Sequence, residues 1–153
     1  MKQVVIENPI LNSPFIEPTR HWKFSDAGIT NEIDGTRRVS AYFIPIAQPR
    51  KKKGSDADQM VFETEWTQDR IEENKFINEV RAQVAQWRAA RYPAVTKTTA
   101  RLLEYWNNPR RDNKLFFCQI EALETAIYLT EAAGKFGGAW IENAIRQAND
   151  GAA

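Results

Sequence analysis

The sequence predicts an α+β protein in which an N-terminal β-hairpin region packs with three to four C-terminal helices. Two observations support this fold class. The stretch 7–20 contains three prolines, which excludes a long helix there. Later in the chain, apolar residues recur at helical spacing, as in Ile77, Val80, Val84 and Trp87. We therefore expect a β-rich region over residues 1–66 and a helical region over residues 67–149.

The β-rich region is expected to consist of hairpins. Asp34 and Gly35 lie between two β-prone runs and have the composition of a two-residue hairpin turn. Residues 41–47 continue the second run, and Pro45 within them indicates an edge strand. Residues 60–66 form a further strand that could pair with 41–47, and the polar, basic stretch 48–59 connects the two.

Four helices are expected in the second region. The first follows Thr67, a plausible N-cap, and has Asp69 in its first turn; Pro93 ends it. A short helix spans about residues 98–106 and ends in turn residues. A third helix contains Gln119 and runs to about residue 133, where Gly134 breaks it. A last helix covers about residues 139–149.

Composition excludes several classes of protein. The 153 residues include 21 basic and 20 acidic ones, so net charge does not indicate nucleic-acid binding and only a local patch could. The single cysteine excludes a disulfide within the chain and fits a reducing compartment. There is no signal-peptide apolar region, and no run approaches the roughly 20 apolar residues of a membrane span. We expect a cytoplasmic protein without a membrane partner.

Gln119 is the first candidate binding residue. It lies in "KLFFCQIEALETAIYLTEAA", residues 114–133, close to the expected start of the third helix. Its amide offers one acceptor and two donors, which are complementary to N6 and N7 of adenine. Phe116 or Phe117 could stack on the base. The alternative is that Gln119 is a partly exposed helix residue, or one that caps a neighbouring loop.

Two basic clusters are candidate nucleic-acid contacts. Their side chains are Arg50, Lys51, Lys52 and Lys53 in the first cluster and Arg110, Arg111 and Lys114 in the second. Either cluster could contact phosphates of DNA, and the second could contact those of a nucleotide. The first could equally be a solvated hairpin tip that opposes aggregation of an edge strand. The second could be an ordinary solvated turn.

A nuclease centre is the rival interpretation. Glu73 and Lys75 have the spacing of the carboxylate–lysine pair of metal-dependent nucleases, and Asp58 or Asp69 could be a further Mg²⁺ ligand. That chemistry needs the pair on a strand, whereas the pattern places it in a helix. The charges are then the solvated face of that helix. We therefore assign no catalytic residue.

No metal ligand is assigned either. His21 is the only histidine, and without a second His or a Cys nearby it is expected to have a structural role beside Trp22. Cys118 lies in an apolar segment, where a thiol is usually inert packing.

Five strings of the sequence, taken together, resemble a known family. They are "VIENPILNSPFIEPTRHWKF", "RRVSAYFIPIA", "ETEWTQDRIEENKFINEVRAQVAQWR", "TTARLLEYW" and "KLFFCQIEALETAIYLTEAA". In this order they look like the N-terminal region of type III restriction enzyme Res-subunit-like proteins, which are superfamily 2 helicases of the DEAD/DEAH type. The resemblance covers nearly all of residues 4–149. It implies that Gln119 matches the adenine-reading Q-motif glutamine.

The phosphate-binding loop of that family is not found in this chain. The loop requires G-x-x-x-x-G-K-[ST], but Gly137 and Gly138 are followed by Ala139 and Trp140. The resemblance thus implies an N-terminal accessory fragment that is not an enzyme by itself. It implies ATP with Mg²⁺ as cofactor of the full-length parent, with the motor domain, duplex DNA and a modification methyltransferase subunit as partners. The alternative is a stand-alone, non-enzymatic DNA-binding or protein-interaction module.

Overall fold

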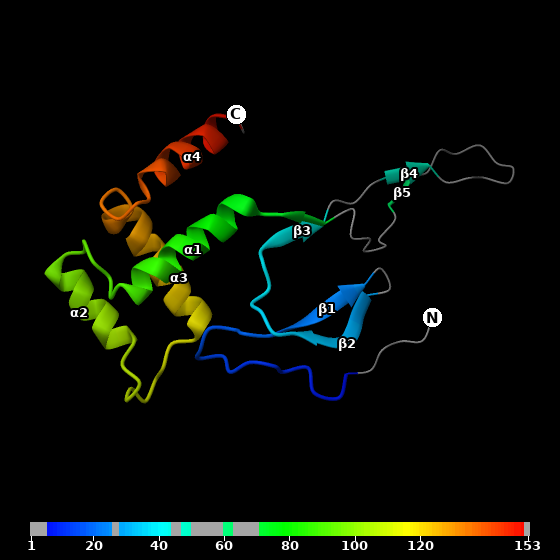
Figure 1. Ribbon diagram of the computed structural model, residues 1–153, viewed down its shortest axis with the longest axis horizontal. Coiled ribbons are helices and arrows are strands. Elements are labelled where there is room, and N and C mark those ends of the chain that lie inside the picture. Colours follow the sequence, from blue (N-terminus) through cyan, green and yellow to red (C-terminus); the bar gives the residue numbers. More distant parts are fainter. Residues whose placement is uncertain (1–5, 26–27, 44–46, 50–59, 63–70, 152–153) are drawn as a thin grey trace, which may run out of the picture. The chain divides into compact units, whose positions relative to one another are not determined.

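The protein has a mixed α+β fold, as the sequence predicts (Figure 1). The computed structural model describes residues 6–25, 28–43, 47–49, 60–62 and 71–151. The chain divides into two compact units. The hairpin unit comprises Met1–Asn12 and Pro18–Lys75, and the helical unit comprises Ser13–Glu17 and Phe76–Ala153. The second unit therefore begins later than the expected boundary at residue 66, and it includes a short segment from near the N-terminus.

The described strands of the hairpin unit form three two-stranded antiparallel sheets. The pairs are β1 (His21–Ser25) with β2 (Gly28–Asp34), β3 (Ala41–Phe43) with β6 (Ile71–Glu73), and β4 (Ala47–Pro49) with β5 (Met60–Phe62). The register of the first sheet places His21 opposite Asp34 and Trp22 opposite Ile33. The expected pairing of 41–47 with 60–66 is observed only at Ala47 and Phe62 among the described residues, and Ala41–Phe43 pair with Ile71–Glu73 instead.

Asp34 and Gly35 do not form the expected hairpin turn. The connection between β1 and β2 falls instead between Ser25 and Gly28. The Asp34 carboxylate accepts the Thr36 N–H at 2.9 Å and the Thr36 hydroxyl at 2.5 Å. This local side-chain turn ends β2, because it offers the backbone an alternative to continuing the sheet.

The first helix starts later than expected. Ile71–Glu73 pair with Ala41–Phe43 as a strand, and α1 spans Lys75–Ala89. At the junction, the Asn74 N–H donates to the Ser40 carbonyl at 2.9 Å. Strand pairing thus overrides the helical preference of this stretch. The expected N-cap Thr67 and the first-turn Asp69 lie outside the described residues.

The remaining helices agree with the sequence prediction to within a few residues. They are α2 (Lys97–Trp106), α3 (Phe117–Ile127), the π-helical turn η2 (Tyr128–Ala132) and α4 (Ala139–Asp150). Thr96 caps α2 by accepting the Thr99 N–H at 3.2 Å. The Glu131 carboxylate accepts the Thr96 N–H at 3.0 Å and the Thr99 hydroxyl at 2.7 Å, which ties η2 to the start of α2.

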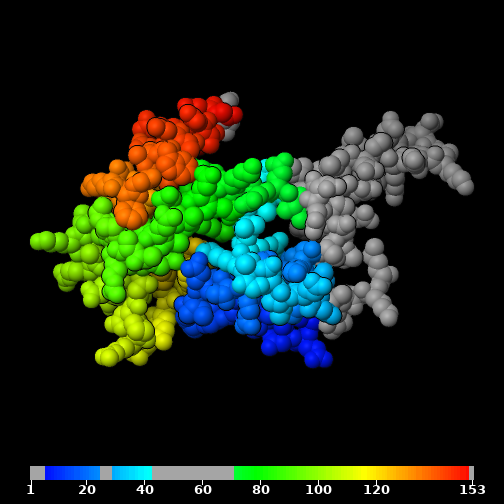
Figure 2. All heavy atoms as spheres, viewed as in Figure 1, coloured from blue at the N-terminus to red at the C-terminus, as the bar shows by residue number. Residues whose placement is uncertain are grey.

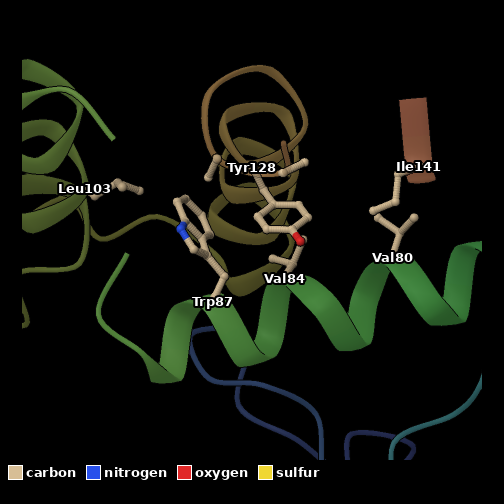
Figure 3. Close-up of a cluster of buried hydrophobic side chains, with 8 residues drawn as sticks. Val80, Val84, Trp87, Leu103, Tyr128 and Ile141 are labelled. Carbon is tan, nitrogen blue, oxygen red and sulfur yellow. The ribbon is translucent and has the colours of Figure 1, made fainter. Parts of the chain in front are cut away.

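The hydrophobic core of the helical unit is formed by side chains from α1, α2, η2 with the residue after it, and α4 (Figure 3). Its buried members are Val80, Val84, Trp87, Leu103, Tyr128, Ala132, Ala133 and Ile141. The Trp87 indole N–H donates to the Pro93 carbonyl at 2.8 Å, which satisfies the one polar atom of that ring. The start of α4 lies directly against α1 in the space-filling view (Figure 2). Ile77, expected in the core stripe, is 43% exposed.

The buried face of α3 includes a charged residue. Ile120, Glu124 and Tyr128 are buried at intervals of four residues, whereas Ala122 and Ala126 are exposed. A carboxylate on the buried face was not expected, because a charged residue is rarely enclosed unless it is paired.

Candidate functional site

Gln119 lies in the first turn of α3, and its side chain is exposed. Its Oε1 atom accepts the backbone N–H of Phe116 at 2.9 Å. The glutamine therefore satisfies an amide at the start of its own helix, whereas the sequence left open the capping of a neighbouring loop. Within the described part of the chain, its Nε2 donors have no partner. Because a carbonyl oxygen has two lone pairs, one acceptor and two donors remain for a ligand.

The two phenylalanines before Gln119 lie in different surroundings. Phe116 is 47% exposed, and its ring centroid lies 5.4 Å from that of Phe15 at an angle of 40°. The Phe117 ring is half-buried and lies 5.3 Å from the Arg88 guanidinium. Of the two expected stacking residues, Phe116 is thus the one with an accessible ring.

The expected basic cluster beside this helix is divided. Lys114 and Arg110 are exposed, whereas the Arg111 guanidinium lies 4.3 Å from the Tyr105 ring centroid. The Arg111 Nη1 atom is buried and has no hydrogen-bond partner. Lys114 borders a cavity of about 220 Å³. Its other walls include Phe15, Ile16, Trp106, Leu115 and Ile120. The structure thus brings Lys114, but not Gln119, to the edge of this cavity.

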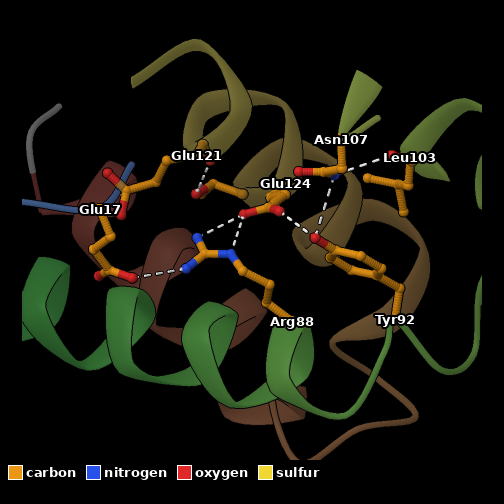
Figure 4. Close-up of polar contacts among 8 residues, drawn as sticks. Glu17, Arg88, Tyr92, Leu103, Asn107, Glu121 and Glu124 are labelled. Atoms are coloured by element: carbon orange, nitrogen blue, oxygen red, sulfur yellow. Dashed lines mark hydrogen bonds and ion pairs between the residues drawn. The ribbon is translucent and has the colours of Figure 1, made fainter. Parts of the chain in front are cut away.

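A buried ionic cluster fixes α3 to α1 (Figure 4). Glu124 is completely enclosed, and its carboxylate accepts the Arg88 Nε–H at 2.7 Å and the Tyr92 hydroxyl at 2.5 Å. Arg88 also pairs with Glu124 through Nη2 at 2.6 Å and with Glu17 through Nη1 at 3.1 Å. The Asn107 amide donates to the Tyr92 hydroxyl at 3.4 Å. The cluster therefore joins residues from α1, the turn after it, α3 and the Ser13–Glu17 segment.

The electrostatics of the cluster favour its charged form. Burial alone disfavours a charged Arg88, but the hydrogen bond that Arg88 donates to Glu124 and the negative charge of Glu124 outweigh this and raise the pKa of Arg88. Burial, followed by the hydrogen bond to Glu124, raises the pKa of the Tyr92 hydroxyl. Tyr92 therefore remains a hydrogen-bond donor to Glu124 at neutral pH. None of these residues was expected from the sequence, although an acid between Ile120 and Tyr128 on one helical stripe is a usable signal.

The first basic cluster and two candidate metal ligands cannot be placed. Arg50, Lys51, Lys52 and Lys53 lie outside the described residues, as do Asp58 and Asp69. Glu73 ends β6 and Lys75 begins α1, so the expectation that one helix carries both is wrong. The pairing of β6 with β3 is the reason. Among the described residues, no group of three His, Cys, Asp or Glu side chains is arranged to hold a metal ion.

His21 and Cys118 lie in different surroundings. His21 Nδ1 lies 2.7 Å from the Thr36 carbonyl, and the adjacent Trp22 donates its indole N–H to the Pro9 carbonyl at 3.2 Å. Cys118 is exposed on α3, so the expectation of a packed thiol is wrong. The reason is that the buried stripe of α3 runs through Ile120 and Glu124, away from this position.

None of the helices in the described part of the chain is long and apolar enough to cross a membrane. Comparison with protein-family models, with curated proteins and with solved structures gave no match. Hypotheses about function therefore depend on the residues themselves and on the resemblance of the five sequence strings.

Proposed function

We propose that the chain is the N-terminal accessory region of an ATP-dependent DNA helicase or translocase of a type III restriction endonuclease. Its role there is to contribute to adenine recognition and to brace the motor domain of the parent chain. The observation that supports this most is the exposed Gln119 amide, which is oriented by its bond to the Phe116 N–H. ATP with Mg²⁺ is the cofactor of the parent, and the partners are duplex DNA and a modification methyltransferase subunit.

The capping bond has a consequence for adenine recognition. It fixes Oε1 at the start of α3, so that its second lone pair can accept the adenine N6–H while Nε2 donates to N7. The Phe116 backbone holds this amide, and the Phe116 ring, which is 47% exposed, could stack on the base. The helix N-terminus adds positive charge at the start of α3, and the exposed Lys114 precedes it in the chain.

The buried cluster supports the role of Gln119 in adenine recognition. Glu124 and Arg88 hold α3 on α1, so Gln119 projects from a helix that is fixed by charge-assisted bonds. A recognition residue on a fixed element loses less entropy when its ligand binds.

A protein-interaction module is the second candidate. A groove of about 440 Å³ between α1 and α3 is lined mainly by apolar atoms. Ile77 and Leu129 in its walls are 43% and 37% exposed. Exposed apolar residues of this kind often mark protein contacts. If this candidate applies, the purified chain self-associates or captures a partner without nucleotide. Analytical ultracentrifugation of the chain with and without ATP distinguishes the two functions.

The decisive experiment compares ATP with GTP as ligands of the full-length parent. Gln119→Glu keeps an oxygen to accept the Phe116 N–H but removes the amide donors, and Gln119→Ala removes both. We expect both variants to weaken ATP binding by about tenfold to a hundredfold, since a hydrogen-bonded base contact is lost. GTP binding should barely change. The chain without a phosphate-binding loop should bind ATP weakly or not at all.

Gln86→Ala is the matched control, because Gln86 is an exposed glutamine on α1. It should leave the binding of both nucleotides unchanged. Equal losses for ATP and GTP in the Gln119 variants, or no loss for either, would show that Gln119 only caps α3.

The purified chain should also lack ATPase and endonuclease activity. With ATP, Mg²⁺ and duplex DNA, we expect only background phosphate release and intact DNA. Turnover that disappears in Glu73→Gln or Lys75→Gln would instead support a nuclease.

A further inference from the structure

The hairpin unit contains a cleft that the proposed function does not use. Its volume is about 490 Å³, within the range of about 300–1,000 Å³ that is usual for ligand sites. Aromatic and cationic side chains share its walls, namely His21, Trp22 and Phe24 from β1 with Arg37 and Arg38 from the segment after β2.

Arg38 is the most informative residue of the cleft. Its guanidinium carbon lies 4.6 Å from the Phe24 ring centroid, a cation–π contact. It forms no ion pair or hydrogen bond with another described residue, and its side chain is exposed. The ring therefore holds a guanidinium whose N–H donors remain available for an anion.

Two side chains of the cleft wall, His21 and Trp22, contact backbone carbonyl groups. The Trp22 indole N–H donates to the Pro9 carbonyl at 3.2 Å, and His21 Nδ1 contacts the Thr36 carbonyl at 2.7 Å. The walls of the cleft are therefore partly ordered before any ligand binds, which lowers the entropy lost on binding.

The charges around the cleft favour an anion. Lys23 pairs with Glu32 at 3.3 Å, so these two side chains largely cancel. The Asp34 carboxylate, opposite His21, is negative, and hydrogen bonds from Thr36 lower its pKa. Arg37 and Arg38 line the cleft itself, and no carboxylate is among the described residues of its walls.

We propose that this cleft binds single-stranded nucleic acid, with a base against its aromatic side chains and a backbone phosphate at Arg38. Aromatic side chains that stack on bases, beside cations that contact phosphates, are the shared chemistry of single-strand binding. A paired base inside a duplex does not expose its face to such a ring. This proposal is independent of the nucleotide role of Gln119.

Fluorescence anisotropy of a labelled thymidine oligonucleotide, titrated with the full chain at low salt, tests the proposal. Arg38→Gln should weaken binding about fivefold or more and lower the salt dependence by about one phosphate contact. Phe24→Leu should weaken it by about fivefold, since the ring that supports Arg38 is lost. Circular dichroism of each variant confirms that it is folded.

Lys23→Gln is the matched control, because it removes one positive charge from the same hairpin without altering a residue that lines the cleft. It should change affinity by less than about twofold, as expected for a charge that is already paired at the surface.

Duplex of the same length should bind more weakly than the single strand, and inorganic phosphate should compete poorly. The proposal is overturned if the chain does not bind the single strand, or if Arg38→Gln and Lys23→Gln weaken binding equally. Equal binding of duplex, or full competition by phosphate, overturns it as well.

Discussion

The helical unit and the hairpin unit are stabilised in different ways. All the buried hydrophobic side chains of the described residues belong to the helical unit, where one core joins α1, α2, η2 and α4. The described strands of the hairpin unit form only two-stranded sheets, and Ile29 and Ile33 on β2 are each 43% exposed. A two-stranded sheet alone is marginally stable in water. The comparison indicates that burial stabilises one unit, whereas local hydrogen bonds and turns contribute more to the other.

The largest expected effect is a difference in hydrogen exchange between the units. Backbone amides of Val84 and Trp87 should exchange several orders of magnitude more slowly than those of β1 and β2. The reason is that the amides in the core are exposed to water only when the core unfolds. Residue-resolved exchange measured by NMR tests this. Equal protection in both units would break the comparison and indicate a single cooperative structure.

Removal of Glu124 should be the most damaging single substitution among those considered. Glu124→Ala leaves Arg88 and the Tyr92 hydroxyl without their shared partner in a buried site. We expect a loss of about 3–5 kcal/mol in the free energy of unfolding, measured by urea denaturation. Glu17 also pairs with Arg88, but the Glu17 side chain is 41% exposed. Glu17→Ala should therefore cost at most about 1 kcal/mol. Similar losses for the two would show that enclosure of the pair contributes little.

Gly138→Ala should have a smaller effect. A Cβ atom at this position would lie 2.6 Å from the Tyr128 hydroxyl oxygen and 3.0 Å from the Ala133 Cβ. We expect a loss of about 1–3 kcal/mol, since both neighbours belong to the core. Gly134→Ala is the control, because no atom lies within 4 Å of an added Cβ there. Urea denaturation should show unchanged or slightly higher stability for this control, and equal losses would contradict the packing argument.

The smallest expected effect is a dependence of stability on acid. Hydrogen bonds from the Thr99 side chain and the Thr96 backbone lower the pKa of Glu131 below its ordinary value of 4.5. The contribution of ionised Glu131 to the free energy of unfolding is therefore fully present above pH 4.5, and it is lost as the pH falls through the lower pKa of the folded state. Glu131→Gln should flatten the decline in helical stability measured between neutral and acid pH.

Asp34→Asn sharpens the same comparison in the hairpin unit. Hydrogen bonds from Thr36 also lower the pKa of Asp34. Because Asp34 belongs to the other unit, its substitution should leave the acid dependence of the helical circular dichroism signal unchanged. A change as large as that caused by Glu131→Gln would mean that the two units unfold together.

The sequence predicts the helices better than the strands, for a physical reason. The stripe of Val80, Val84 and Trp87 is local information, and it identifies α1 as well as its buried face. Whether Ile71–Glu73 form a strand or a helix depends on Ala41–Phe43, about thirty residues away, and no local pattern shows that pairing. Strand pairing was therefore harder to predict than helix formation.

Only part of the candidate site could be predicted from the sequence. The amide chemistry and position of Gln119 follow from residue type and helix spacing, whereas its bond to the Phe116 N–H does not. The pairing of Glu124 with Arg88 joins positions 36 residues apart and requires a tertiary structure. The exposure of Cys118 also depends on which stripe of α3 faces the core.

The π-helical turn η2 has a consequence for the length of the chain. The Ala133 N–H donates to the Tyr128 carbonyl, five residues back, at 2.7 Å, so this turn contains one residue more than an α-helical turn would. Such a turn is equivalent to a one-residue insertion in the last turn of the helix, because a turn follows η2. Loss of a single codon at the exposed Leu129 would restore ordinary α-helical bonding there and shorten the helix at its end. The same deletion within α1 would rotate one half of its buried stripe toward solvent.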